Sequence, residues 1–376
     1  MKAMILAAGS GTRLRPLTHD LPKPMLPLLG KPVLEYLIEH LASAGIKQIM
    51  INTSYMAPAI EQYFGHGQRL GVQIGYSFEG HIENNKIFPQ PIGSAGGLRK
   101  IQDLGGFFNE TTLVVCGDAL IDLDVGAAMR EHKQKRALVS LVVKEVPWQQ
   151  VSSYGIVVSD DDGRITSFQE KPQRDEALSN WASTGIYIFE PEALDLIPFG
   201  LPFDIGGQLF PLLVAQGLPF YAQRRHFNWL DIGNVHDYWS ATQRALRGEI
   251  ADIRPPGTEI RKGVWVGLNT RIDWQNTEIT GPVYIGPGAH IEAGCRIIGP
   301  TWIGHGCRLE AGVQITRSIL FEYTRIAAGA QLDEVIVSGN YCVSKTGDNI
   351  EPAGAVRPWS DARAKEHADS LVSRLK

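Results

Sequence analysis

At 376 residues, the chain is longer than the roughly 250–300 residues at which one hydrophobic core stops growing, so two domains are expected. Apolar residues make up 44% of the composition and charged residues 20%, and the formal net charge of -4 excludes a strongly basic surface for nucleic acid. The first apolar run, residues 3–8, ends at Gly9 and is too short for a signal peptide or a membrane span. We expect a cytoplasmic protein without nucleic-acid or membrane partners.

The first predicted strand, residues 2–7, leads into a loop that contains Gly9 and Gly11. Glycines let backbone N–H groups approach an anion closely, and Arg13 and Lys23 add positive charge. Lys23 follows Arg13 by ten residues and lies between two prolines. A two-glycine loop alone fits a tight turn equally well, but together with both cations it predicts a phosphate-binding site.

Short β-rich runs alternate with helical patterns as far as about Gly248, which predicts an α/β domain with a mostly parallel sheet. The predicted strands are residues 2–7, 47–53, 72–78 and 112–116. A helix is predicted because apolar residues recur at helical spacing before Gly45, at Leu34, Leu37, Ile38 and Leu41. Ligands of such sheets collect at the carboxyl ends of the strands, and Gly9 and Asp118 follow two of these ends.

A hairpin is predicted where residues 156–159 and 165–169 flank the turn Asp161-Asp162-Gly163-Arg164. Glu170 and Lys171 follow it directly, and Pro172 comes next. A glutamate and a lysine on a surface strand usually form a solvated ion pair that contributes little to stability. These residue types alone therefore assign no function.

A second domain is predicted beyond Arg254-Pro255-Pro256-Gly257, which has the composition of a linker. Apolar residues then recur every six positions without a slip, at Ile285, Ile291, Ile297, Ile303, Leu309 and Ile315. Cys295 and Cys307 are among the small or β-branched residues four positions after these, and we expect them to fill the core. The repeat predicts a parallel β-helix of hexapeptide repeats with about four to five coils of about 18 residues. Its register is expected to blur at Asn276 and again past Phe321.

The predicted organisation is thus an α/β domain over residues 1–248, a linker over 249–262, a β-helix over 263–350 and a tail over 351–376. The polar tail, from Ser360 on, has scattered apolar positions that allow a helix. The four cysteines show no zinc or CxxC spacing, so neither disulfides nor a structural metal are expected. His290 and His305 occupy hexad corners, where exposure explains them better than the acyltransferase histidine of some hexapeptide proteins.

The opening segment Gly9-Ser10-Gly11-Thr12-Arg13-Leu14-Arg15-Pro16, with Pro22-Lys23-Pro24 after it, resembles the signature of the sugar-1-phosphate nucleotidyltransferases, or NDP-sugar pyrophosphorylases. Further motifs match in order: Gly93-Ser94-Ala95-Gly96-Gly97, Cys116-Gly117-Asp118, Tyr154-Gly155, Glu170-Lys171-Pro172, Thr184-Gly185-Ile186-Tyr187 and Trp229-Leu230-Asp231-Ile232-Gly233. The resemblance covers about residues 1–245. It implies a Rossmann-like mixed-sheet nucleotidyltransferase domain, followed by a left-handed parallel β-helix.

The resemblance also implies a reaction in which a sugar phosphate oxygen attacks the α-phosphorus of a nucleoside triphosphate and expels pyrophosphate. Arg13 and Lys23 are expected to act catalytically at the triphosphate and Lys171 at the sugar phosphate. Asp118 and Asp231 match the carboxylates that the family pairs around Mg²⁺, although each alone also fits an ordinary structural role. The nucleotide-binding positions implied are Leu6, Ala8, Gly9, Gly11, Thr12, Gly93 and Ser94, and the sugar-phosphate positions are Gly155, Glu170, Lys171 and Thr184.

Three departures from the family pattern fall near the loop expected to face the base. Ser94 replaces the usual threonine, Gly97 is an added glycine, and residues 80–89 resemble an insertion before this loop. The insertion puts the nucleotide preference in doubt.

Over the whole chain, the motifs look most like those of the cyanobacterial UDP-glucose pyrophosphorylases, so UTP and glucose 1-phosphate are the expected substrates. GDP-mannose synthesis is the alternative, followed by dTDP- or ADP-glucose synthesis. Some relatives keep the fold as catalytically silent regulatory subunits, but these usually lose the charged site residues that this chain retains. The flat sides and open end of a β-helix favour a homo-oligomer.

Overall fold

The computed structural model describes residues 1–84, 86–250, 253–351 and 357–364, and it separates into two units. The first unit consists of Met1–Thr12, Thr18–Leu26 and Pro32–Asp231. The second consists of Arg13–Leu17, Pro27–Lys31 and Ile232–Lys376. Helix α6 (Val235–Leu246), which falls within predicted domain 1–248, therefore groups with the second unit.

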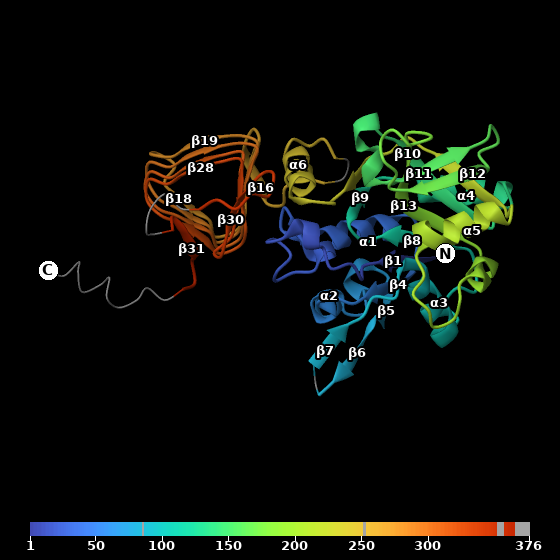
Figure 1. Ribbon diagram of the computed structural model, residues 1–376. Helices are drawn as coiled ribbons and strands as arrows, with labels where there is room; N and C mark the ends of the chain where they lie inside the picture. Colours follow the sequence, from blue (N-terminus) through green and yellow to red (C-terminus); the bar gives the residue numbers. More distant parts are fainter. Residues whose placement is uncertain (85, 251–252, 352–356, 365–376) are drawn as a thin grey trace. The chain divides into compact units, whose positions relative to one another are not determined.

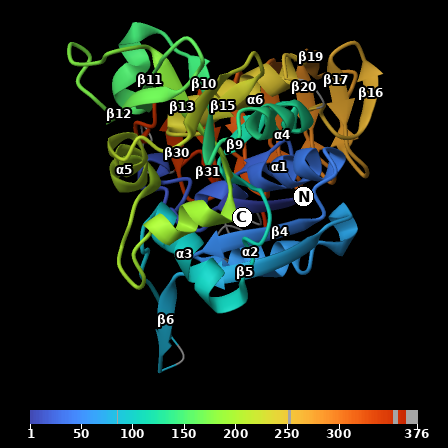
Figure 2. The ribbon, with the colours of Figure 1, turned by 90° about the vertical axis from the view of Figure 1, so that its right-hand side faces the viewer.

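A nine-stranded mixed sheet forms the centre of the first unit (Figures 1 and 2). Its strands follow the order β12 (Ile165–Glu170), β11 (Gly155–Ser159), β13 (Trp181–Phe189), β8 (Thr112–Cys116), β1 (Lys2–Leu6), β4 (Gln48–Thr53) and β5 (Gln73–Phe78), with β10 (Val139–Glu145) paired to β13 and β14 (Phe220–Arg224) paired to β10. Strand β1 is parallel to both neighbours, whereas β13 is antiparallel to β8. The predicted α/β fold is confirmed, but the sheet is parallel only from β8 through β1 and β4 to β5 and between β10 and β14, whereas the pairs made by β11 and β13 are antiparallel.

Helices cover both faces of this sheet because alternate side chains of each strand point to opposite sides. Ala3 and Ile5 of β1 share a core with α1 (Val33–Ser43), α2 (Ala57–Phe64) and α4 (Val125–Gln134). Met4 packs on the other side with α3 (Ser94–Gly105) and α5 (Phe210–Ala215). Burial on both faces explains the continuous apolar sequence of β1.

The order in which the chain adds strands reverses beside β1, and this position is the topological switch point of the sheet. After β1, the chain adds β4 and β5 on one side and then returns to add β8 on the other. Loops that follow β1 and β8 therefore diverge at the carboxyl edge, where ligands of such sheets bind. The four predicted strands all form, although Ala7, Lys47 and Val72 lie just outside them.

Short paired segments complete the first part of the chain. They are β2 (Pro27–Leu28) with β3 (Lys31–Pro32), β9 (Ala119–Ile121) with β15 (Trp229–Asp231), and β6 (Gly80–Glu83) with β7 (Lys86–Pro89). Residues 80–89, where an insertion was expected, form the β6–β7 hairpin, which projects from its unit in both views (Figures 1 and 2). The side chain of Ile82 on this hairpin is 68% exposed.

Three ladders of short strands make up the repetitive part of the second unit. One contains β16 (Thr258–Arg261), β17 (Val264–Val266), β20 (Val283–Ile285), β23 (Thr301–Ile303), β26 (Ile319–Leu320), β29 (Val335–Val337) and β30 (Cys342–Ser344); another contains β18 (Arg271–Ile272), β21 (His290–Ile291), β24 (Arg308–Leu309), β27 (Thr324–Ile326) and β31 (Trp359–Asp361); the third contains β19 (Glu278–Thr280), β22 (Arg296–Ile298), β25 (Gln314–Thr316) and β28 (Gln331–Asp333). Apart from the end strands β16, β30 and β31, the pairing is parallel. This is the arrangement of a β-helix.

The hexad residues lie inside the coil as predicted. Ile297 is fully buried, and both Cys295 and Cys307 are buried free thiols. Ser360 and Asp361, where a helix was expected to begin, instead lie in β31, which pairs with β27. The remainder of that predicted helix, residues 365–376, lies outside the described residues.

The first coil of the β-helix is longer than the second. Val264 pairs with Val283, and Val283 in turn pairs with Thr301 in the next coil. The step in sequence from Val264 to Val283 exceeds the step from Val283 to Thr301, so the first coil holds an extra residue. This longer coil contains Asn276, where the register was expected to blur.

Later coils are shorter than either of these. Trp302 pairs with Ile319, and the next coil repeats the same shortened step. The corners of these coils contain Arg317 and Glu334, both with positive φ. The second irregularity thus begins at Arg317, before Phe321 rather than past it.

Among the described helices, none combines the length and the apolar character needed to cross a membrane.

We predict that Ile297→Ala lowers the free energy of unfolding of the β-helix by about 3 kcal/mol, because it removes buried methyl groups and leaves a cavity. Ile297 is paired with Ile279 and Ile315 in adjacent coils. Urea denaturation followed by circular dichroism measures the loss. Gln314→Ala, on an exposed position of the same ladder, is the control. Equal stabilities for the two variants would contradict the assignment of Ile297 to the core.

Candidate active site

The loop after β1 packs against the turn that carries Lys23. Gly11 has a φ of +63°, and a Cβ at this position would lie 3.0 Å from the Cβ of Lys23. The Thr18 hydroxyl donates to the Gly11 carbonyl at 2.9 Å. Both the backbone conformation and the close approach therefore require glycine. A Cβ at Gly9 would have no neighbour within 4 Å, so the middle of the loop has open space for a ligand.

The other residues predicted to bind the nucleotide at this loop are spread along it. Leu6 ends β1, Ala8 is half-buried, and the exposed Thr12 begins a short 3-10 turn. Arg13 groups with the second unit. There burial raises the pKa of Asp237, and the positive charge of Arg13 is one of the influences that oppose this increase. Arg13 and Lys23, close in sequence, thus belong to different units.

One lysine and two carboxylates come together at the carboxyl edge of the sheet. Lys23 Nζ forms an ion pair with Asp118 Oδ2. Asp118 follows β8, and the Gly117 N–H beside it donates to the Leu6 carbonyl at 2.9 Å, which ties this turn to β1. Asp231 ends β15, which pairs with β9 so that Asp231 stands opposite Ala119. This pairing explains how two aspartates far apart in sequence reach the same site.

The charges of these groups influence one another. Burial lowers the pKa of Lys23, but the negative charges of Asp118 and Asp231 outweigh it, so the pKa lies above its ordinary value. Burial, together with the same two carboxylates, raises the pKa of Cys116. Lys23 is therefore a cation at neutral pH, and Cys116 is a neutral thiol rather than a nucleophile.

Glu170 and Lys171 lie together where β12 ends. Glu170 stands opposite Gly155 in the β11–β12 pair, and a Cβ at Gly155 would lie 3.2 Å from Glu170 Oε2. A Cβ at Gly206 would lie 2.6 Å from the same oxygen, so two glycines make room for this carboxylate. Lys171 Nζ lies 3.1 Å from Glu170 Oε1. The lysine has a φ of +46°, an unfavourable backbone conformation that is common at binding sites.

The Thr184 hydroxyl makes its hydrogen bond within the sheet. Its side chain is buried, and Oγ1 donates to the Val142 carbonyl at 2.7 Å within the sheet. The next residue, Gly185, has a φ of +73°, and a Cβ there would lie 2.7 Å from Cys116 Sγ. Because this hydroxyl is already bonded to Val142, the predicted contact of Thr184 with the sugar phosphate would have to come from its backbone, and it stays a prediction.

The loop predicted to face the base is held by a distant segment. A Cβ at Gly93, which has a φ of +81°, would lie 2.5 Å from the Phe203 carbonyl oxygen. Ser94 Oγ donates to Asp204 Oδ2 and accepts from the Ile205 N–H, both at 2.8 Å. Asp204 could not be predicted from the sequence, because no motif or spacing connects segments that are 110 residues apart.

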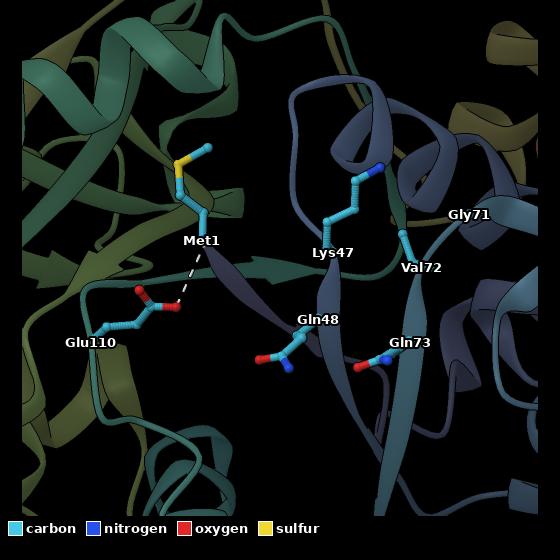
Figure 3. A pocket seen from close by; sticks show the side chains of 7 residues that line it. All are labelled: Met1, Lys47, Gln48, Gly71, Val72, Gln73 and Glu110. Carbon is cyan, nitrogen blue, oxygen red and sulfur yellow. Dashed lines mark ion pairs between the residues drawn. The ribbon is translucent and has the colours of Figure 1, made fainter.

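The hollow in Figure 3 lies at the opposite edge of the sheet and has a volume of about 360 Å³. It is lined by Met1, Lys47, Gln48, Gly71, Val72, Gln73 and Glu110. Met1 precedes β1, and Gln48 and Gln73 begin β4 and β5, so this hollow is at the amino ends of the strands. The glycine loop and Asp118 follow carboxyl ends, so the hollow is no part of the candidate active site.

A mixed sheet whose parallel central strands end in a glycine loop, with a charged lysine and two carboxylates at the same edge, defines an α/β enzyme that handles phosphate groups. More particularly, the chain belongs to the nucleotidyl transferase family, whose model matches residues 2–248. A second model, described as the GMPPB C-terminal domain, matches residues 279–351. The predicted family is therefore confirmed.

Two curated relatives cover most of the chain. A Synechocystis protein named UTP--glucose-1-phosphate uridylyltransferase is 53% identical over 365 residues, which are 96% of this chain and 94% of the relative. A Mycobacterium tuberculosis protein named mannose-1-phosphate guanylyltransferase is 33% identical over 78% of this chain and 82% of its own length.

A solved structure supports the fold alone. It is a Bacillus anthracis protein provisionally named a glucose-1-phosphate thymidylyltransferase, with a TM-score of 0.55 and 24% identity, covering 64% of this chain and 94% of that chain.

We predict that Asp118→Asn lowers the pKa of Lys23, because it removes the nearer of the two negative charges while the burial of the lysine remains. A pH titration followed by ¹³C NMR at the lysine Cε measures the change. The Lys23 resonance should titrate at lower pH in the variant than in the wild type. An unchanged Lys23 titration would contradict the electrostatic coupling.

Proposed function

We propose that the chain makes UDP-glucose and pyrophosphate from UTP and glucose 1-phosphate. The observation that carries this proposal is the 53% identity, over 96% of the chain, to the Synechocystis protein named UTP--glucose-1-phosphate uridylyltransferase. The arrangement of Lys23, Asp118 and Asp231 at the carboxyl edge of the sheet supports it, because the reaction needs charged groups where phosphates meet.

In the proposed reaction, a phosphate oxygen of glucose 1-phosphate forms a bond to the α-phosphorus of UTP. The bond from that phosphorus to the β-phosphate oxygen breaks, and pyrophosphate leaves with the electron pair. Two polyanions must approach, so the positive charge of Lys23 favours the transition state by offsetting charge on the triphosphate and the leaving group. We assign the same task to Arg13, the sugar phosphate to Lys171, and the sugar hydroxyls to Glu170.

We propose Mg²⁺ as the cofactor, held by Asp118 and Asp231. Their oxygens are the hard donors that this ion prefers, and it commonly takes one or two protein carboxylates with phosphate and water as its other ligands. Among the described residues, no group of three or more His, Cys, Asp or Glu side chains could hold a metal by itself. Substrate oxygens would therefore complete the coordination. When bound, the ion would neutralise phosphate charge.

The second candidate is GDP-mannose synthesis. The match of residues 279–351 to the GMPPB C-terminal domain and the relative from M. tuberculosis favour it. The identity of 33% to that relative is well below the 53% to the Synechocystis protein, so we rank it second.

Finer features implied by the family resemblance extend this proposal. We propose that the β-helix is left-handed and that the enzyme is a homo-oligomer. The expected cytoplasmic location stays a prediction.

We predict that purified protein with Mg²⁺ releases pyrophosphate fastest from UTP and glucose 1-phosphate. The test combines UTP, GTP, dTTP and ATP with glucose 1-phosphate or mannose 1-phosphate, and repeats each pair with excess EDTA, which should abolish release. Faster turnover of GTP with mannose 1-phosphate would replace the first candidate by the second. No turnover with any pair would identify a catalytically silent subunit.

We predict that Lys23→Ala lowers kcat by about 100-fold or more, because it removes a positive charge placed at the reacting phosphates. Steady-state kinetics measure the loss, and circular dichroism checks that the fold is kept. Lys47→Ala is the matched control, because Lys47 is exposed and lines the hollow at the opposite edge of the sheet (Figure 3). If Lys23→Ala turned over like the wild type, Lys23 would have no catalytic role.

A further inference from the structure

Three hydrogen bonds join the loop after β1 to the loop before α3. The Ala7 N–H donates to Asn52 Oδ1 at 2.7 Å, and Asn52 Nδ2 donates to Glu79 Oε1 at 2.7 Å. Glu79 Oε2 then accepts from the Ile92 N–H at 3.1 Å. Ala7 opens the glycine loop and Ile92 directly precedes Gly93, so two buried side chains connect two segments predicted to bind the nucleotide.

We call this chain of three hydrogen bonds through Asn52 and Glu79 the relay. Its donors and acceptors can be arranged in only one direction. A backbone N–H donor faces inward at each end, so both ends need an acceptor. A side-chain amide offers one acceptor oxygen and one NH₂ nitrogen that only donates, and a carboxylate offers two acceptor oxygens. Asn52 with Glu79 therefore gives each of the three contacts one donor and one acceptor, whereas two amides would leave one N–H donor facing another. Such a buried unsatisfied donor is costly.

The surroundings of Glu79 hold this carboxylate in place. Its N–H donates to the Thr53 carbonyl at 2.7 Å, and its own carbonyl accepts from Ser54 Oγ at 2.6 Å. A Cβ at Gly97 would lie 2.4 Å from Glu79 Oε1, so the added glycine of helix α3 makes room for the carboxylate. Glu79 is 1% exposed and does not reach solvent. It therefore acts on a ligand through the loops that it holds.

Burial raises the pKa of Glu79, and the hydrogen bonds from Asn52 and Ile92, with the charge of Lys100, oppose that increase. Both carboxylate oxygens accept hydrogen bonds, as suits the ionised form.

We propose that Asn52 and Glu79 are positioning residues that hold the glycine loop and the Gly93 loop in one fixed arrangement for the nucleotide. The inference rests on the proposed function, since it takes these two loops as the triphosphate and base sites. Loosening the relay should weaken nucleotide binding, while the sugar-phosphate side, around Glu170 and Lys171, is unaffected.

The test exchanges the carboxylate and the amide. Glu79→Gln leaves an N–H donor facing another donor, and Asn52→Asp places two carboxylates against each other. Each single variant should raise KM for UTP about tenfold, the effect of one buried unsatisfied group. The double variant N52D/E79Q restores all three hydrogen bonds with the same net charge and size. Its KM for UTP should return to within about twofold of the wild type, since the two effects are coupled.

Two further measurements separate positioning from a purely structural role. KM for glucose 1-phosphate should stay within about twofold in all three variants, because the relay joins the two nucleotide loops and not the sugar-phosphate side. Glu35→Gln is the matched control. Glu35 is also a buried carboxylate, but it pairs with Arg69 and lies in α1, outside both loops. The control variant should lower thermal stability without changing KM for UTP.

Unchanged KM values for UTP in both single variants would overturn the proposal, and so would losses that add up in the double variant. If the single variants fail to fold, the double variant decides: a wild-type KM supports the relay and a raised KM overturns it. The wild type distinguishes this result from failure of the proposed function. Without turnover of UTP and glucose 1-phosphate by the wild type, the proposed function fails, and the relay is then measured with the nucleotide that the wild type uses.

Discussion

The Lys23–Asp118 ion pair stands where β1 and β8 end, and the site around it depends on keeping one ammonium beside two carboxylates in a partly buried place. Burial alone would favour the neutral amine, and two carboxylates without a cation would repel each other. The two carboxylates stabilise the charged form of Lys23 against the effect of burial. Strands β1 and β8 are parallel neighbours, so the loops that follow them begin side by side before they diverge, and the β9–β15 pair adds Asp231. The fold thus holds Lys23 charged beside carboxylates, and we expect the phosphate groups of a substrate to replace a carboxylate as its partner.

Sequence patterns predicted the parts of the fold that repeat or that alternate. The strands around β1, the hairpin β11–β12 and the buried hexads of the β-helix form as expected, because each is specified by local periodicity. Ala7 was placed in the first strand, yet its N–H bonds to Asn52, a side chain that no local pattern brings near it. The direction of the Thr184 hydroxyl and the contact of Ser94 with Asp204 were likewise beyond reach, because both depend on which distant segments the tertiary fold places together.

The β-helix keeps its strands aligned although its coils differ in length. Its coils become shorter along the chain, yet Ile285, Ile303 and Leu320 remain aligned in one ladder. The changes occur at corners, where Arg317 takes a left-handed conformation, and not within strands. A strand that lost a residue would turn its apolar side chains outward, because successive side chains point to opposite faces. Hexads can therefore be read from the sequence, whereas a shortened corner is harder to locate.

The β6–β7 hairpin has a consequence for how this enzyme can diverge. Glu79 closes the base of the hairpin, since its carbonyl accepts from the Gln90 N–H at 3.0 Å, and the same residue fixes the loops on either side. The exposed strands beyond that base lie outside the Asn52–Glu79 relay. We therefore expect mutations in the exposed strands of the hairpin to leave the hydrogen bonds of the Asn52–Glu79 relay in place. If the relay has its proposed role, the surface of the hairpin is where we expect the sequence to vary while the two loops keep their arrangement.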